Sequence, residues 1–265
     1  MQDRLSVPIV LILIITINSN FALCKESRKI EKSFALKRDG QVFIDTYKGS
    51  ITIETWSKNE VKVRIKIEAD EWDSYAEKKV KNTEIKFRAS KNSLKIKTDY
   101  DKIQSRSSRI FSKDVGSLPL VHYWIKMPAT SELKVDDYKS DTRITDLHAP
   151  IEFETYKGTV VVNGLKGSID LETYKGDIEI EFDKISGDSR FETYKGNIEL
   201  MFQSRASFDV RATIGYKADF DSDFKLDVKH RGSKRSDRTY LGAINSGGPE
   251  LFVETDKGDI RLLRK

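Results

Sequence analysis

A short tetrapeptide repeated at near-constant spacing constrains this chain more than any other feature. Thr-Tyr-Lys-Gly occurs four times, and degenerate copies stand at Asp137–Ser140 and Thr255–Gly258. From Tyr138 onward the tyrosines of the copies are 18, 18 and 20 residues apart. A fixed period of this length is typical of a repeat protein built from stacked supersecondary units. The complete copies occupy residues 46–49, 155–158, 173–176 and 193–196.

Each repeat has the pattern of two short strands joined at a corner. In residues 168–182, apolar and polar side chains alternate with the period of two that a half-buried strand requires. Lys175-Gly176 interrupts the alternation, and glycine supplies the backbone freedom of a sharp turn. The side chains predicted to face inward are Ile169, Leu171, Thr173, Ile178, Ile180 and Phe182.

One such unit buries too few apolar side chains to offset the entropy of ordering its own backbone, so the units must stack on one another. Two arrangements satisfy the pattern, a parallel solenoid and an antiparallel meander in which Lys-Gly is a hairpin turn. Lys-Gly is a poor hairpin turn compared with Asn-Gly, and a parallel ladder explains why outward residues recur. We therefore predict an all-β, single-chain β-solenoid with strand-turn-strand rungs of 18–20 residues.

The N-terminus predicts export. Residues 7–17 are apolar apart from Thr16, which is too short for a membrane-spanning helix and typical of a signal peptide. Ala22 and Cys24 fit a small-x-small cleavage site, so residues 1–24 form the predicted leader and Lys25 begins the mature chain. The destination would be the periplasm, the cell surface or the medium, with no membrane span left after cleavage. A less favoured alternative is a lipoprotein anchored at Cys24.

The rest of the chain, residues 25–265, is predicted to form a single domain. The regular repeats cover 131–204 and closing rungs cover 205–265, whereas the section 57–130 departs from the repeat. That irregular section should hold β-strands around 60–69, 85–87, 94–96 and 121–127 and one short helix. The helix is expected over 74–82, with Ser74 or Asp73 as its N-cap.

Three segments are similar to a known family. They are the strand Val121–Pro128 with the following Leu133-Lys134-Val135, the strand-turn-glycine units, and the closing segment Leu251–Ile260. Over roughly 40–265 the chain resembles the bacterial putative-adhesin domains of unknown function, which are related to head-domain autotransporter-like adhesins. The resemblance implies a β-solenoid fold, export and no established enzymatic activity, and it brings no functional residues with it.

The sequence offers little for catalysis. The three histidines, His122, His148 and His230, have no metal-ligand spacing, and no phosphate loop, nucleophile elbow or Ser/His/Asp order is visible. We therefore predict no catalytic residue, cofactor or metal. Two weaker alternatives are a glycosidase built on the recurring carboxylates and a calcium site. Their residues are Glu154, Glu172 and Glu192, and Asp219, Asp221 and Asp223.

The most informative outward residues are the tyrosines and lysines of the repeat. They have two interpretations, a ladder that only shields the strand edges, and a binding stripe for an acidic polysaccharide or another cell-surface component. The net charge of +5 is too small to indicate nucleic acid, and the basic run 229–238 is a second candidate contact for an anionic polymer. The stripe residues are Tyr156, Tyr174, Tyr194, Lys157, Lys175 and Lys195.

Together these observations predict a non-catalytic, extracytoplasmic, adhesin-like binding or scaffold module. Two alternatives from other classes stay open. A polysaccharide-active solenoid enzyme would need two carboxylates in unlike environments, whereas a repeat makes them alike. A polymer-forming structural solenoid would self-associate.

Overall fold

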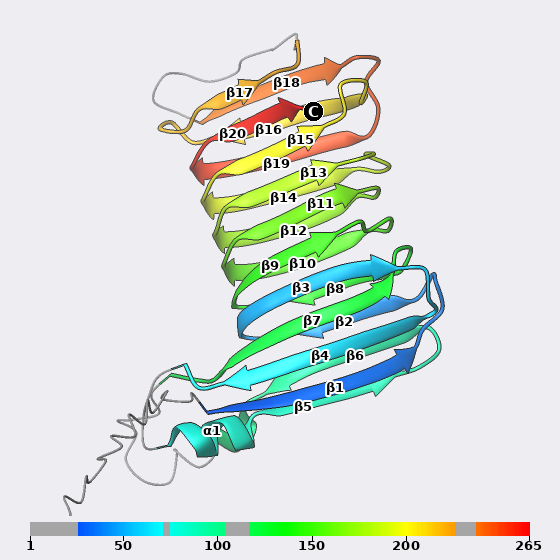
Figure 1. The fold of residues 1–265 in the computed structure, drawn as a ribbon. Coiled ribbons are helices and arrows are strands. Elements are labelled where there is room, and N and C mark those ends of the chain that lie inside the picture. The colour runs from blue at the N-terminus through cyan, green and yellow to red at the C-terminus, as the bar shows by residue number, and fades with distance from the viewer. Residues whose placement is uncertain (1–25, 71–74, 104–116, 226–236) are drawn as a thin grey trace, which may run out of the picture.

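The computed structural model describes residues 26–70, 75–103, 117–225 and 237–265. In this part the chain forms a stack of rungs, each with one strand in either of two facing sheets (Figure 1). In spatial order, the first sheet consists of β5 (Glu84–Ala89), β6 (Ser93–Asp99), β2 (Gln41–Asp45), β8 (Glu132–Asp136), β10 (Ile151–Lys157), β12 (Ile169–Lys175), β14 (Ser189–Lys195), β19 (Glu250–Lys257), β16 (Phe208–Ile214) and β18 (Arg238–Ile244).

The second sheet runs alongside it in the same way. Its spatial order is β1 (Ser27–Ala35), β4 (Glu60–Glu68), β7 (Leu120–Pro128), β3 (Lys48–Trp56), β9 (Lys139–Thr145), β11 (Val160–Leu165), β13 (Ile178–Phe182), β15 (Ile198–Phe202), β20 (Ile260–Arg264) and β17 (Phe220–Ser222).

The rungs pair in parallel, which confirms the solenoid and rejects the meander. Glu154 lies beside Glu172, and Glu172 lies beside Glu192, so each repeat sits in register on the next. Within the described residues, antiparallel pairing is confined to the two ends of the stack. There, β1, β4 and β7 pair antiparallel at one end together with β5 and β6, and β16 pairs with β18 at the other.

The order of the rungs in space differs from their order in the chain at both ends. The first complete rung, β2 with β3, lies between β6/β7 and β8/β9. The last rung in the sequence, β19 with β20, lies between β14/β15 and β16/β17. The first and last complete rungs are therefore each held between two other rungs, whereas the N-terminal strand β1 forms one edge of the second sheet.

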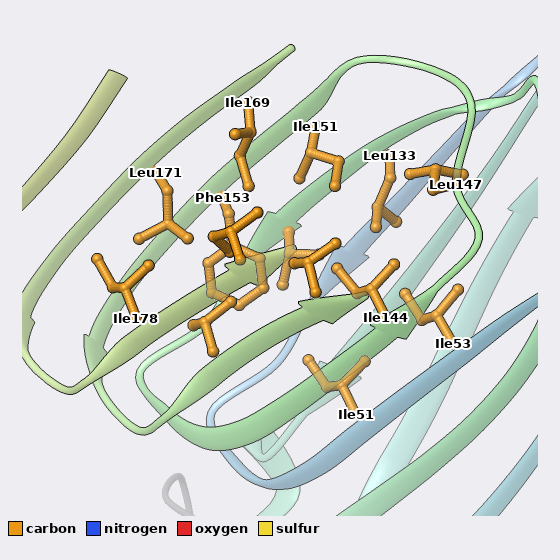
Figure 2. Close-up of a cluster of buried hydrophobic side chains, with 14 of the residues drawn as sticks. Ile51, Ile53, Leu133, Ile144, Leu147, Ile151, Phe153, Ile169, Leu171 and Ile178 are labelled. Carbon is orange, nitrogen blue, oxygen red and sulfur yellow. The ribbon is translucent and has the colours of Figure 1, made fainter. Parts of the chain in front are cut away.

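The core fills the space between the two sheets. Figure 2 shows Leu133, Ile151 and Ile169 of the first sheet facing Ile144 and Ile178 of the second. The predicted alternation is confirmed. Ile169, Leu171, Ile178 and Ile180 are at most 2% exposed, while Glu172, Tyr174 and Glu179 face solvent. Burial of these side chains is the main stabilising contribution.

The repeated glycine after each lysine is required by close packing as well as by the turn. A methyl group added to Gly176 would lie 1.9 Å from the carbonyl oxygen of Gly158 in the preceding rung. Gly158 itself has a φ of +129°, which side chains rarely tolerate. The corner therefore brings successive backbones into direct contact and leaves a strip without side chains.

The short helix is present as α1 (Ala76–Asn82), slightly shorter than predicted. Ala76 and Val80 are buried, as their shared face requires, and Arg28 of β1 donates hydrogen bonds to the carbonyl oxygens of Lys81 and Thr83. The predicted N-caps, Asp73 and Ser74, fall outside the described residues, as does the predicted leader. Within the described residues, no helix has the length and apolarity needed to cross a membrane.

Candidate functional site

The tyrosines of successive rungs stack face to face in a single column, which we call the tyrosine ladder. Neighbouring ring centroids are 4.6–5.0 Å apart and the ring planes differ by 4–11°. Each of these tyrosine residues keeps between 37% and 41% of its surface exposed. In this geometry the ring faces are turned toward each other along the solenoid, so the ring edges and hydroxyl groups are what solvent meets. The ladder consists of Tyr47, Tyr138, Tyr156, Tyr174 and Tyr194.

Both ends of the tyrosine ladder are also covered. Tyr100 packs its ring edge-on against Tyr47, with centroids 6.1 Å apart and planes at 75°. At the other end, the ammonium group of Lys257 lies 4.4 Å from the centroid of the Tyr194 ring and donates a hydrogen bond to its hydroxyl. That hydrogen bond holds the pKa of Lys257 above its usual value. At every position of the column, the ring faces on which a sugar could stack are therefore already covered by a neighbouring side chain.

The lysines that follow the tyrosines form a second column, which we call the lysine ladder. Lys48 is paired with Asp70 at 2.7 Å, and Lys257 bonds to Tyr194. The four lysines between them have no carboxylate within 4 Å among the described residues. The members, which the strand pairing places in register, are Lys48, Lys139, Lys157, Lys175, Lys195 and Lys257.

A groove of about 580 Å³ follows the lysine ladder. Its floor is the strip of corner glycines, Gly158, Gly176 and Gly196, which offers backbone without side chains. Asp141 and Asp177 lie on the far side of this strip, and each carboxylate accepts a hydrogen bond from the backbone N–H of the next rung. The groove is therefore straight and positively charged along one wall. Because no side chains cover its floor, an extended polymer chain can lie along it.

A column of carboxylates lies on the opposite side of the tyrosine ladder, and a second groove of about 690 Å³ runs between the two columns. These carboxylates form no ion pair with the lysine ladder within the described residues. The tyrosine column stands between the two charged columns, and Glu192 pairs instead with Arg190 of its own strand. Burial of the Glu254 carboxyl raises its pKa, and the neighbouring negative charge of Glu192 raises it further. The column is Asp45, Asp136, Glu154, Glu172, Glu192 and Glu254.

One rung breaks the repeat at two positions that compensate each other. Asp137 replaces the inward threonine and Ser140 replaces the corner glycine. The buried carboxylate accepts hydrogen bonds from the Ser140 N–H and hydroxyl at 2.7 Å each and from the Thr155 hydroxyl at 3.0 Å. Burial nevertheless dominates and raises the pKa of Asp137 to about 6.

The structure brings all six predicted stripe residues together in two adjacent columns, and it extends both columns. Sequence reasoning did not assign Tyr47, Tyr138, Lys48, Lys139 and Lys257 to the stripe. The signal was present, because Tyr47 lies in a complete Thr-Tyr-Lys-Gly copy and Tyr138 and Lys257 lie in the two degenerate ones. Stacking Tyr47 on Tyr138 requires knowing that rungs distant in sequence are neighbours, which the tetrapeptide alone does not reveal.

A second polar arrangement was not visible in the sequence. The Ser50 hydroxyl lies 2.8 Å from Nδ1 of His122, whose Nε2 lies 3.4 Å from a Glu68 carboxylate oxygen. This row resembles a hydrolase triad, but β3 and β7 are each paired on both sides. Their N–H groups are used in the sheet, which leaves no pair of donors beside Ser50 to stabilise an oxyanion. The row is better explained as cross-strand hydrogen bonding.

Two weaker candidates gain no support. Most of the basic run 229–238 lies outside the described residues. Of the three aspartates, Asp223 accepts a hydrogen bond from the Arg264 N–H, and the Asp219 side chain is 89% exposed. No group of three metal-ligating side chains converges within the described part of the chain.

Parallel rungs with in-register surface columns define the chain as a β-solenoid protein. A family model described as Toastrack DUF4097 matches residues 22–263, so the chain belongs to this family. The predicted resemblance to a β-solenoid family of unknown function is thereby confirmed at the level of family.

Solved structures with a similar arrangement share little sequence with this chain. A "putative cell adhesion protein" from Clostridium sporogenes is 10% identical, covers 90% of this chain and 100% of its own, and has a TM-score of 0.46. A "putative adhesin" from Bacteroides fragilis is 11% identical, covers 89% of this chain and 97% of its own, and has a TM-score of 0.39. No curated protein matches the chain.

Proposed function

We propose that this protein is an exported, non-catalytic binding module that holds a linear polyanion, an acidic polysaccharide of the cell surface, along its lysine ladder. The observation that carries the proposal is the run of four in-register lysines without a carboxylate partner in the described residues, beside a groove with a glycine floor. The predicted leader over residues 1–24 supports export.

The spacing of the rungs explains why a polymer is the favoured ligand. Neighbouring strands lie about 4.8 Å apart, so the ladder repeats a positive charge at that interval along a straight line. Two such charges repel by roughly 1 kcal/mol in water. A chain with regularly spaced anionic groups neutralises several lysines at once and displaces their counterions, as other polyanions do. A small anion would relieve only one contact.

The tyrosine ladder has a supporting role in this proposal. Because its ring faces are covered by each other, it contributes hydroxyl groups and ring edges instead of stacking platforms. The ammonium groups of Lys157 and Lys175 lie 5.8 and 5.2 Å from the ring centroids of Tyr156 and Tyr174. The rigid stack therefore keeps the lysine side chains in register and separates them from the carboxylate column.

Catalysis is disfavoured by the same repetition. A glycosidase needs one protonated and one ionised carboxyl group, and so two different environments. Glu154 and Glu172 occupy equivalent positions on successive rungs and face the same groove. The Ser50–His122–Glu68 row lacks a free oxyanion site, as described above.

The test is retention on an acidic polysaccharide column. Changing Lys157, Lys175 and Lys195 together to serine should abolish retention and leave the melting temperature almost unchanged, because these partly exposed lysines form no ion pair among the described residues and surface charges contribute little to folding. Retention of the unmodified protein should weaken steeply between about 0.05 and 0.5 M salt, over which screening shortens to a few Å.

A matched control removes the same charge elsewhere. Lys91, Lys166 and Lys184 are exposed in loops away from the lysine ladder, and their joint change to serine should preserve most of the retention. If this control lost as much binding as the ladder variant, net charge and not the ladder would be responsible. Full retention by the ladder variant, or salt-insensitive retention, would contradict the proposal.

A further inference from the structure

One exposed tryptophan on the second sheet, Trp124, presents the aromatic face that the tyrosine ladder lacks. Trp124 lies on β7 with its side chain on the outer face of the sheet, and it is 39% exposed. The nearest ring is His122, whose centroid is 6.2 Å away and whose plane is tilted by 36°. No ring is stacked on the indole among the described residues, in contrast to every tyrosine of the ladder.

Trp124 and Arg64 together form the ridge between two grooves. One groove, of about 370 Å³, is lined on its other side by Trp56, Lys62 and Lys126 among others. The second groove, of about 620 Å³, is lined by Ile30 and residues of β1 and β4. Both volumes fall within the range of small-ligand sites. Trp124 and Arg64 belong to both linings, so a ligand in either groove meets the same two side chains.

The guanidinium group of Arg64 is an uncommitted cation at this place. Arg64 lies directly opposite Trp124 in the antiparallel pair of β4 and β7. Its lysine neighbours are paired, with Lys62 bonded to Glu31 at 2.5 Å and Lys126 bonded to Glu54 at 2.9 Å. Arg64 has no ion pair or hydrogen bond within the described part of the chain, and it influences Glu31 only as a minor longer-range charge.

These two side chains have complementary chemistry for one kind of ligand. An indole face packs against the apolar C–H face of a sugar ring, and a guanidinium group binds a carboxylate through two parallel hydrogen bonds. We propose that Trp124 and Arg64 form a subsite for a sugar ring that carries a carboxylate, such as a uronic acid unit. The choice of an acidic sugar deepens the proposed function, but the subsite is separate from the lysine ladder.

The position of the subsite is compatible with one polymer reaching both surfaces. Trp124 pairs with Thr52 on β3, the strand that begins at Lys48 of the lysine ladder. Four residues of extended strand span about 13 Å, the length of a few sugar units. The subsite would then fix one ring of a chain whose other acidic groups follow the lysines.

The experiment uses two short probes of equal length, tetragalacturonate and the neutral cellotetraose, with the full mature chain and isothermal titration. Tetragalacturonate should bind more tightly. Trp124→Ala should weaken its binding by about two- to tenfold, the effect of losing one stacking contact. Arg64→Ala should remove the preference for the acidic probe, and Arg64→Lys should restore it only in part because lysine binds a carboxylate as a point charge.

Three controls separate the outcomes. Tyr216→Ala removes an exposed aromatic ring elsewhere and Arg88→Lys alters an exposed arginine of β5, so neither should change the affinity. The serine variant of Lys157, Lys175 and Lys195 should still bind tetragalacturonate even though it loses the polysaccharide column. Thermal melts confirm that each variant is folded.

Several results would overturn the subsite. Unchanged affinity in Trp124→Ala, equal binding of both probes, or loss of tetragalacturonate binding only in the lysine variant would each do so. Binding that depends on Trp124 and Arg64 but occurs only with vesicles of phosphatidylglycerol would identify a lipid surface, and not a sugar, as the occupant. Failure of the lysine ladder on the column, by contrast, would leave this subsite standing.

Discussion

In the middle of the solenoid, from β8 to β15, the tyrosine, lysine and carboxylate of each rung lie beside residues of the same kind, whereas at the two ends the strands turn antiparallel and the outward residues vary. In the middle, the faces of the tyrosine rings are therefore buried against each other, because each ring stacks on the next tyrosine. The lysines of the same rungs cannot stabilise each other in this way, since neighbouring positive charges repel. The regular region thus accumulates unpaired lysines.

The ends solve a different problem. A stack of parallel strands would expose unpaired backbone groups at both faces, and such edges promote aggregation. At one end, Phe34 of β1 and Phe87 of β5 bring the two sheets together with ring centroids 5.2 Å apart. At the other, Phe220 and Tyr240 stack at 4.6 Å. Variation of sequence at the ends closes the core, and it also leaves the Trp124 ring exposed with no aromatic ring stacked on it in the described residues.

The largest expected effect tests whether a buried charge destabilises the middle of the solenoid more than it destabilises the end. Leu171→Asp places a carboxylate in a core position that is 0% exposed, on a strand paired on both sides. We expect a loss of at least about 4 kcal/mol in the free energy of unfolding, enough to prevent accumulation of folded protein. Ile85→Asp, on the half-buried edge strand β5, should cost about 1–2 kcal/mol. Urea denaturation measures both.

The surface control for this pair is Glu179→Lys. Glu179 faces solvent on β13, so its substitution should change the free energy of unfolding by less than about 0.5 kcal/mol. If Glu179→Lys were more damaging than Leu171→Asp, the assignment of inward and outward faces would be off by one residue. Equal costs for Leu171→Asp and Ile85→Asp would remove the distinction between middle and end.

A smaller effect distinguishes the one irregular rung within the regular region. Asp137 has a pKa of about 6 in the folded protein and 3.8 as a free side chain. Because the folded-state pKa is raised, the protonated form stabilises the fold below pH 3.8, and this contribution is lost as the pH rises through 6. A shift of this size corresponds to at most about 3 kcal/mol.

The double change Asp137→Thr with Ser140→Gly restores the repeat and removes this dependence. Relative to the unmodified protein, the variant should gain up to about 3 kcal/mol of unfolding free energy between pH 4 and pH 7.5. Urea denaturation of both proteins at several pH values measures this difference. Parallel pH profiles would show that the hydrogen bonds from Ser140 and Thr155 fully compensate the buried charge.

Sequence reasoning succeeded where a local rule determines the structure. The 18-residue spacing predicted parallel columns, and the period of two correctly placed Thr173 inside, where it and the equivalent Thr155 and Thr193 are at most 5% exposed. It could not find the order of the rungs, because any rung of this pattern stacks equally well on any other. The insertion of β19 and β20 between β14/β15 and β16/β17 depends on pairings between strands that are distant in the sequence.

The same limit explains what was missed at the surface. Trp124 lies in an ordinary alternating strand, and nothing in its neighbourhood in the sequence marks it as a site. Its significance comes from Arg64, which is 60 residues away in the chain but directly opposite it in the sheet. The Ser50–His122 contact likewise joins residues whose proximity is created by the pairing of β3 with β7.

The smallest expected effect concerns the tyrosine ladder itself, and it separates ring from hydroxyl. Tyr174 is stacked on both sides, at 4.9 Å from Tyr156 and 5.0 Å from Tyr194. Tyr174→Ala should therefore cost about 1–3 kcal/mol, from two contacts of roughly 0.5–1.5 kcal/mol each. Tyr174→Phe keeps the ring and should change the free energy of unfolding by less than about 0.5 kcal/mol. Tyr216→Ala, at an exposed ring outside the ladder, is the matched control and should also cost less than about 0.5 kcal/mol. Urea denaturation is the measurement, and an equally small loss in Tyr174→Ala and Tyr216→Ala would show that the stack does not stabilise the middle of the solenoid. If Tyr174→Phe lost polysaccharide binding, the tyrosine hydroxyl groups would contact the ligand directly instead of only supporting the lysines.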